Sequence, residues 1–179
     1  MREIPQQYLD ATLGDATFQS YDTVQLKYRG LWTRIEILQG RITFHDPAGN
    51  YLSQIDTPAQ DLCCTLIGDY FGPPRTEKIK VIVWDCWRTG VINEDHHHVH
   101  WDDLTTYPYR DRLAFARLHT SRVGAPLEGC KTYPIASAQT LWNSQTPNTC
   151  GLVFRKSTDP VDHPLLVVRA YDNLPRGLE

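Results

Sequence analysis

The stretch VQLKYRGLWTRIEI, residues 24–37, places a lysine and a glycine inside a segment that otherwise has the composition of β-strands. The β-branched and aromatic residues on either side predict strands over residues 23–28 and 32–38. Gly30 stands between the two strands, where a residue without a Cβ atom lets the backbone turn tightly. Lys27 then has two interpretations: a lysine on an edge strand with its amine in water, or a nucleophile held at the end of a strand.

The next part of the chain also predicts strands. A third strand is predicted at 41–45, joined to the second by a tight turn at Gln39-Gly40. Two longer segments, DLCCTLIGDYFG (61–72) and KIKVIVWDCW (78–87), predict strands separated by a Gly-Pro-Pro break. The second of them is apolar on both faces, which is typical of a central, buried strand.

The remaining segments predict two helices and two late strands. The sequence YRDRLAFARLHTSR predicts a helix at 109–122, with a proline just before its first turn. A shorter helix is predicted at 136–143, and strands are predicted at 150–156 and 164–171. Because strands and helices come in blocks rather than in alternation, we expect an α+β fold with mainly antiparallel sheets.

Composition and charge narrow the classes of protein to which this chain can belong. Its formal net charge of −3 gives no global basic field for nucleic acid. No apolar run approaches the roughly 20 residues of a membrane-spanning helix, and the N-terminus lacks the apolar core of a signal peptide. The five cysteines include no CxxC pair, which favours reduced thiols over disulfides or a structural zinc site. We therefore expect a globular cytoplasmic protein.

Several short motifs follow one another along the chain. The first is Lys27-Tyr28-Arg29-Gly30, at the end of a predicted strand. Their order resembles that in the nucleotidyltransferase domain shared by ATP-dependent DNA ligases, RNA ligases and mRNA capping enzymes. The later motifs that carry the resemblance are TLIGDYFG (65–72), VIVWDCW (81–87), YPYRDRLAFAR (107–117), CGLVFRK (150–156) and LLVVRAY (165–171).

The resemblance implies an architecture. It predicts two mainly antiparallel sheets flanked by helices, with a nucleotide pocket between the sheets. We expect a single nucleotidyltransferase-like domain over residues 1–177 and no OB-fold domain. The final Leu178-Glu179 is interpreted as the remnant of a tag.

The resemblance also implies a reaction and a role for each motif. Lys27 would attack the α-phosphate of ATP to form a covalent lysyl-AMP, and the AMP would pass to a nucleic-acid 5′-phosphate. Trp84 would stack on the base, and Asp69 and Asp85 would bind Mg²⁺. The expected cofactors are therefore ATP and Mg²⁺, the expected partner is a nucleic acid with a 5′-phosphate end, and the protein is expected to be a monomer. The residues expected to bind the nucleotide are Arg29, Gly30, Arg34, Asp69, Trp84, Arg155 and Arg169.

Two positions depart from the family pattern. Cys150 stands where the family has a glutamate, and a thiol is a poor ligand for a hard ion such as magnesium. Val167 stands where the family has a lysine that contacts the α-phosphate, so that only Arg169 keeps a positive charge there. These departures favour an alternative, a nucleotide- or nucleic-acid-end-binding module that has lost catalysis. A third hypothesis is an unrelated β-rich interaction domain.

The segment NEDHHHVHWDD, residues 93–103, has the composition of a metal site. If it were extended, His96, His98 and His100 would share one side and could bind a metal ion. Its place after the aromatic-Asp strand instead favours a polar loop insertion.

Arg110 and Arg112 lie at the start of the predicted helix. They are either surface charges or phosphate ligands, because a positive charge is unfavourable at a helix N-terminus and needs another partner. Cys63 and Cys64 are flanked by leucines, which favours a packing role over reactivity.

Overall fold

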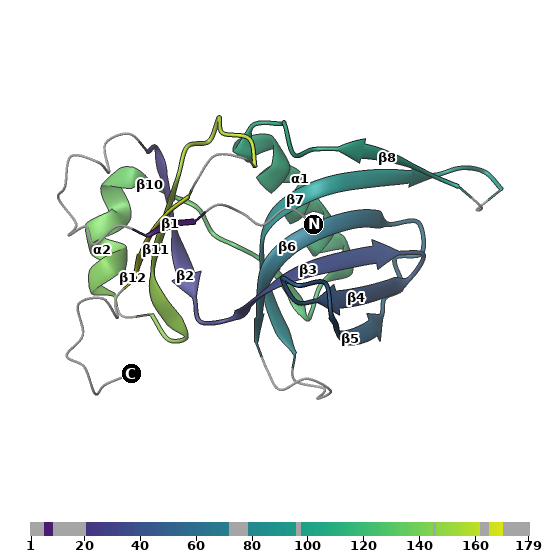
Figure 1. The fold of residues 1–179 in the computed structure, drawn as a ribbon, viewed down its shortest axis with the longest axis horizontal. Coiled ribbons are helices and arrows are strands. Elements are labelled where there is room, and N and C mark those ends of the chain that lie inside the picture. Colours follow the sequence, from purple (N-terminus) through teal and green to yellow (C-terminus); the bar gives the residue numbers. More distant parts are fainter. Residues whose placement is uncertain are drawn as a thin grey trace. The chain divides into compact units, whose positions relative to one another are not determined.

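The computed structural model describes residues 21–71, 79–95, 98–144 and 146–161, together with backbone strands at 6–8 and 165–169. The chain divides into two compact units: a large unit (Met1–Glu3 and Gly30–Cys130) and a small unit (Ile4–Arg29 and Lys131–Glu179). Each unit is described by itself, with strands and helices labelled as in Figure 1. The single domain over residues 1–177 stays a prediction.

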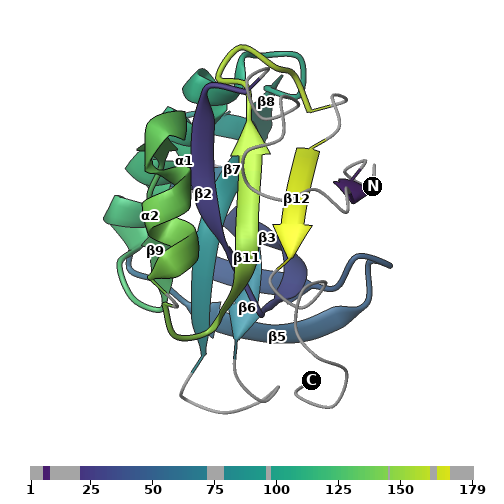
Figure 2. The same ribbon diagram turned by 90° about the vertical axis from the view of Figure 1, so that its left-hand side faces the viewer.

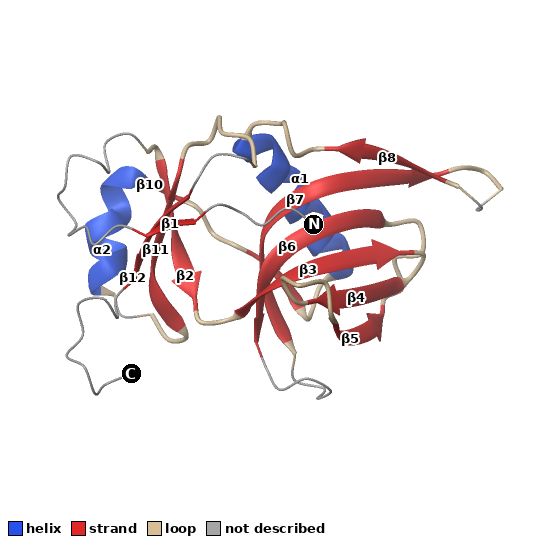
Figure 3. Ribbon diagram, viewed as in Figure 1, coloured by secondary structure: helices blue, strands red, loops and turns tan. Residues whose placement is uncertain are grey.

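The large unit is built on a seven-stranded sheet. Six strands lie in the order β5-β4-β3-β6-β7-β8 with antiparallel neighbours, and β9 pairs in parallel with β7. Strands therefore dominate this unit, and α1 (Tyr109–Val123) packs against β7 and β9 (Figure 3). The strands are β3 (Leu31–Leu38), β4 (Arg41–His45), β5 (Tyr51–Asp56), β6 (Cys63–Phe71), β7 (Lys80–Ile92), β8 (Val99–Asp103) and β9 (Leu127–Gly129).

Alternating side chains on β3 give the sheet two different faces. Ile35 and Ile37 are fully buried and belong to a core cluster that also contains Ala116 of α1. Arg34 and Glu36 are only partly buried, and they point to the opposite face because successive side chains of a strand alternate. The face that packs on α1 is therefore apolar, whereas the other face carries charged side chains.

The tight turn predicted at Gln39-Gly40 is confirmed. Gln39 (φ 48°) and Gly40 (φ 81°) both have positive φ values, as a two-residue hairpin turn between β3 and β4 requires. The break predicted at Gly-Pro-Pro falls within residues 72–78, outside the described residues.

The polar loop predicted at 93–103 is wrong in its second half, because residues 99–103 form β8. Strand β7 also runs five residues beyond the predicted end at position 87, and β8 pairs with this extension from Arg88 to Ile92. A Cβ atom on Gly90 would lie 2.6 Å from a methyl carbon of Val99 and 3.0 Å from the ring of Trp101. The glycine therefore makes room for the side chains of the neighbouring strand.

The small unit contains a five-stranded sheet in the order β1-β12-β11-β2-β10. Its core cluster includes Val24, Leu152 and Phe154, with α2 (Ala138–Asn143) alongside β11 (Figure 2). Pairing in this sheet is antiparallel except for β1 with β12. The strands are β1 (Gln6–Tyr8), β2 (Thr23–Tyr28), β10 (Tyr133–Pro134), β11 (Thr149–Arg155) and β12 (Leu165–Arg169).

Both predicted helices are present. The helix predicted at 109–122 is α1, and the one predicted at 136–143 is a 3₁₀ turn (Ile135–Ser137) that continues into α2. In the part of the chain that the structure describes, no helix is long and apolar enough to cross a membrane.

Candidate nucleotide-binding site

Lys27 lies next to the last residue of β2 in the small unit. Its Cα partner on β11 is Gly151, so no side chain stands directly across from it on that strand. The half-buried lysine donates a hydrogen bond from Nζ to the backbone oxygen of Tyr28, 3.1 Å away. The side chain of Lys27 therefore folds back toward the end of its own strand. Its amine, the predicted nucleophile, is held there by this hydrogen bond.

A β-bulge in β11 lies beside the end of β2. The pairing register shifts between Thr149 and Gly151, which leaves Cys150 without a Cα partner on β2. Arg29 binds this irregular segment, because its Nε donates to the backbone oxygen of Thr149 at 3.1 Å. The chain therefore brings the motif CGLVFRK (150–156) beside Lys27-Tyr28-Arg29-Gly30, although the two are more than 100 residues apart.

Cys150 occupies this bulge with its side chain buried. Its thiol lies 3.8 Å from the backbone oxygen of Tyr28, within hydrogen-bonding range for sulfur. A neutral thiol in this place supplies a weak donor rather than a carboxylate. The departure from the family glutamate therefore falls directly beside the strand that carries Lys27.

Arg155 is buried inside the small unit. Its Nε donates to Oε1 of Gln25 at 2.9 Å, and Nε2 of Gln25 donates to Oγ1 of Thr132 at 3.0 Å. These contacts give Arg155 a structural partner, and its predicted contact with phosphate stays a prediction. The backbone of Arg169 is in β12, but its side chain lies outside the described residues, as does that of Val167.

Gly30 and Asp69 are in close contact in the large unit. A Cβ atom on Gly30 would lie 2.8 Å from Cβ of Asp69 and 2.9 Å from its backbone carbon. Asp69 is only 2% exposed, opposite Trp32 on the neighbouring strand. The close approach of β6 therefore requires a glycine at position 30. The same contact places the end of the first motif beside Asp69, the acidic residue of the TLIGDYFG motif.

Replacing Gly30 with alanine should destabilise the fold, since the added methyl group overlaps backbone atoms that cannot rotate away. We expect a loss of about 1–3 kcal/mol in the free energy of unfolding, measured by urea denaturation. Gly129→Ala is the matched control, because a Cβ atom there meets its nearest neighbour at an ordinary 3.5 Å. Equal stability of the two variants would contradict the steric argument.

Trp84 lies in β7 and is 7% exposed, yet it belongs to neither of the two core clusters. The hydroxyl of Tyr109, on the first turn of α1, donates to the backbone oxygen of Trp84 at 2.6 Å. The pairing of β6 with β7 also shifts register here, between Ile67 and Gly68. The helix therefore fixes the backbone of the predicted base-stacking residue at an irregular point of the strand.

Asp85 forms a buried ion pair with Arg112. Arg112 Nε donates to Oδ1 at 2.8 Å and Nη2 donates to Oδ2 at 3.1 Å, and both side chains are at most 3% exposed. Arg112 Nη1 also donates to the backbone oxygen of Tyr107 at 2.6 Å. Neither of the two roles predicted for Arg112 fits. It is buried, so it is not a surface charge, and its guanidinium binds the carboxylate of Asp85 instead of a phosphate.

The same ion pair bears on the predicted metal site. Both oxygens of Asp85 are engaged by a guanidinium and Asp69 is buried, so the predicted role of these two carboxylates as magnesium ligands stays a prediction. Among the described residues, no group of three or more His, Cys, Asp or Glu side chains is placed to hold a metal ion. His96 lies outside those residues.

Arg34 projects from β3 on the face opposite α1. Its Nε is 3.3 Å from Oε1 of Glu36, an ion pair whose geometry leaves Nε without a hydrogen-bond acceptor. This Nε atom is buried, whereas the side chain as a whole is 27% exposed.

Three cysteines of the large unit lie in an environment that disfavours nucleophilic reactivity. Cys63, Cys64 and Cys86 are fully buried and form no disulfide. Burial raises the pKa of each thiol, so that the reactive thiolate is not formed at neutral pH. The packing role predicted for Cys63 and Cys64 fits this environment.

An open cavity of about 820 Å³ lies elsewhere in the large unit. None of the predicted site residues lines it. Its walls are Gln39, Gln60, Asp61, Gly90, Val91, Ile92 and Arg122.

Comparison with known proteins places the fold. No protein-family model matches the sequence, and no curated protein sequence matches it significantly. The chain resembles a mycobacterial DNA ligase D complexed with ATP and MES, with a TM-score of 0.62 and 15% identity over 93% of this chain and 60% of that one. It also resembles the ligase domain of LigD from M. tuberculosis, with a TM-score of 0.60 and 14% identity over 92% and 58% of the two chains.

These likenesses confirm the resemblance that the motif order predicted, at the level of the fold. The chain has a fold like that of the ligase domain of LigD. It spans 60% and 58% of the lengths of the two structures that it resembles.

Proposed function

We propose that the protein is an ATP-dependent polynucleotide ligase-like nucleotidyltransferase. Nζ of Lys27 attacks the α-phosphate of ATP, the bond to the β-phosphate oxygen breaks, and pyrophosphate leaves. The resulting lysyl-AMP then transfers its AMP to the 5′-phosphate of a nucleic-acid end. The protein acts as a cytoplasmic monomer in this proposal.

The chain has a fold like that of DNA ligase D. Within this fold, one contact supports the proposal. The glycine of Lys-x-x-Gly packs directly on Asp69, the acid expected to serve the ribose or the metal. The pairing of β3 with β6 places the glycine of the first motif beside the acidic residue of a later one, as the resemblance requires. The contact therefore supports the identification of Lys27 as the nucleophile.

Magnesium enters this proposal with the phosphates of ATP. Mg²⁺ is commonly bound by one or two carboxylates together with substrate phosphates, and in this proposal Asp69 would be the carboxylate. The ion would supply charge neutralisation at the phosphates. Asp85 is committed to Arg112 and holds the strand rather than the ion.

Intact-mass measurement after incubation with ATP and Mg²⁺ tests the function. A mass increase of one adenylyl group is expected. Absence of the adduct together with tight binding of ATP would favour the second candidate, a binding module without catalysis. The buried thiol of Cys150, in place of a carboxylate, is the observation that favours this second candidate.

Trp84→Ala should weaken ATP binding by about one to two powers of ten, because base–aromatic stacking contributes roughly 1–3 kcal/mol. Calorimetric titration with ATP measures the effect on a variant shown to be folded. Tyr51→Ala is the control, since Tyr51 is an aromatic residue 63% exposed on the edge strand β5. Unchanged affinity in Trp84→Ala would show that the base binds elsewhere.

A further inference from the structure

Five side chains from four neighbouring strands form a polar network on the large-unit sheet, on the face opposite α1. We define the polar network as Arg34 and Glu36 of β3, Thr65 of β6, Arg88 of β7 and Trp101 of β8. Glu36, Thr65 and Arg88 lie at directly paired positions across the three central strands. They therefore point to the same side of the sheet.

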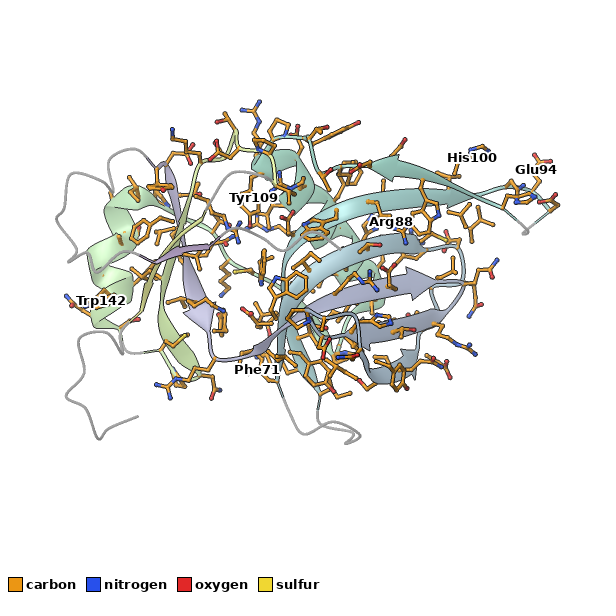
Figure 4. The ribbon with its side chains drawn as sticks, viewed as in Figure 1. Phe71, Arg88, Glu94, His100, Tyr109 and Trp142 are labelled. Atoms are coloured by element: carbon orange, nitrogen blue, oxygen red, sulfur yellow. The ribbon has the colours of Figure 1, made fainter. Side chains whose placement is uncertain are left out.

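Arg88 is the centre of the polar network. Its Nε donates to Oγ1 of Thr65 at 2.7 Å and its Nη2 donates to Oε2 of Glu36 at 3.1 Å. The hydroxyl of Thr65 in turn donates to Oε2 of Glu36 at 2.8 Å. Arg88 is thus fixed in position at the base of the β7–β8 hairpin, where it pairs with Asp103, whereas His100 lies nearer the tip (Figure 4).

Two guanidinium groups of the polar network keep unused donors. Nη1 of Arg88 has no hydrogen-bond partner among the described residues, and the side chain is 42% exposed. Nε of Arg34 lacks an acceptor in the described part of the chain but is itself buried, so a ligand would reach this partly exposed side chain through its terminal nitrogens. Glu36 is shared by both arginines and Asp103 lies directly across from Arg88, so the polar network offers guanidinium donors rather than a net positive charge. The polar network is therefore suited to an anion with several acceptor oxygens, such as a phosphodiester.

Trp101 adds an aromatic surface beside these donors. The guanidinium carbon of Arg88 lies 3.9 Å from the centroid of the indole ring, which holds the ring in place. Trp101 is nevertheless 36% exposed, on the edge strand of the sheet. An exposed ring that is already ordered can stack on a planar group at little cost in side-chain entropy.

We propose that the polar network binds a single-stranded segment of nucleic acid, with a phosphate on Arg34 and Arg88 and an unpaired base stacked on Trp101. This inference rests on the proposed function, in which a polynucleotide is the acceptor of AMP, and it assigns that substrate a docking surface on the large unit. Charged donors next to an ordered aromatic ring match the two repeating features of a single strand, its phosphates and its bases. Asp103, the cross-strand neighbour of Arg88, is turned toward Thr105, whose backbone and hydroxyl both donate to its Oδ1, and it keeps its negative charge there.

Fluorescence anisotropy with a labelled single-stranded oligonucleotide, in the absence of ATP, tests the proposal. Trp101→Ala should weaken binding about ten-fold, and Trp101→Phe should retain most of the affinity because it keeps an aromatic face. Arg88→Gln should weaken binding and also lower the slope of log affinity against log salt by about 0.7, the value expected for one lost phosphate contact on a single strand. Trp101→Ala should leave that slope unchanged.

His100→Ala is the matched control, since His100 is exposed on the same strand but pairs with Val91 on the other face of the hairpin. It should bind the oligonucleotide as the parent does. Trp101→Leu replaces Trp101→Ala if the latter does not fold. Absence of binding by the parent at low salt, or parental affinity in both Trp101→Leu and Arg88→Gln, would overturn the proposal. Because the assay contains no ATP, its outcome is independent of lysyl-AMP formation, which decides the proposed function separately.

Discussion

Incubated with α-labelled ATP and Mg²⁺, the parent protein should take up label that is stable to acid, and Lys27→Ala should take up none above background. The adenylyl group is bonded to Nζ, so removal of the amine removes the site of attachment itself. Lys27→Arg should also fail, because a guanidinium stays protonated at neutral pH and cannot attack phosphorus. Gel electrophoresis under denaturing conditions measures the label.

The control for this prediction is Lys80→Ala. Lys80 is 60% exposed and its ion pair with Glu128 is on the surface, so its loss should alter neither the fold nor the labelling. Circular dichroism should show that Lys27→Ala is folded. Label that persists in Lys27→Ala would end the assignment of Lys27 as the nucleophile.

Arg112→Ala should lower the free energy of unfolding by about 3–5 kcal/mol, because it leaves the Asp85 carboxylate buried without its counter-charge. Asp85→Ala should have a similar cost for the same reason, with the guanidinium then left unpaired. Urea denaturation of each variant measures these losses. A cost this large would be a sizeable share of the net stability of a domain of this size.

Arg110→Ala is the matched control for the ion pair. Arg110 lies on the same first turn of α1, is 64% exposed and is 3.8 Å from Asp111. Its removal should change stability by less than about 0.5 kcal/mol. If Arg112→Ala were no more destabilising than Arg110→Ala, the ion pair would not hold α1 to β7, and Asp85 would again be available to a metal ion.

The strands and turns around the first motif were predictable because their signals are local. The predicted strands at 23–28, 32–38 and 41–45 match β2, β3 and β4 to within one residue. Gln39-Gly40 carries the positive φ angles that a tight hairpin needs, and this requirement is written in the residue types themselves. The order of the motifs along the chain likewise predicted the likeness to a ligase domain that comparison with solved structures found.

The hairpin beyond Trp87 was not predictable in the same way. In HHHVHWDD the apolar–polar alternation is confined to Val99-His100-Trp101-Asp102, and the four histidines and two acids of the segment favour a polar loop. Pairing with β7 makes residues 99–103 extended. The pairing depends on Gly90, whose missing side chain accommodates Val99 and Trp101. Tertiary context therefore overrode the local composition.

The sequence by itself determined Lys27-x-x-Gly30, the strand segments and the residue types available for chemistry, since each depends on neighbours within a few positions. Only the tertiary structure decided which of these residues meet. Gly30 packs on Asp69 because β3 and β6 are neighbours in the sheet, and Asp85 is neutralised by an arginine 27 residues away on α1. Such partners follow from strand order, register and bulges, and a shift of one residue in register turns a side chain to the opposite face of the sheet.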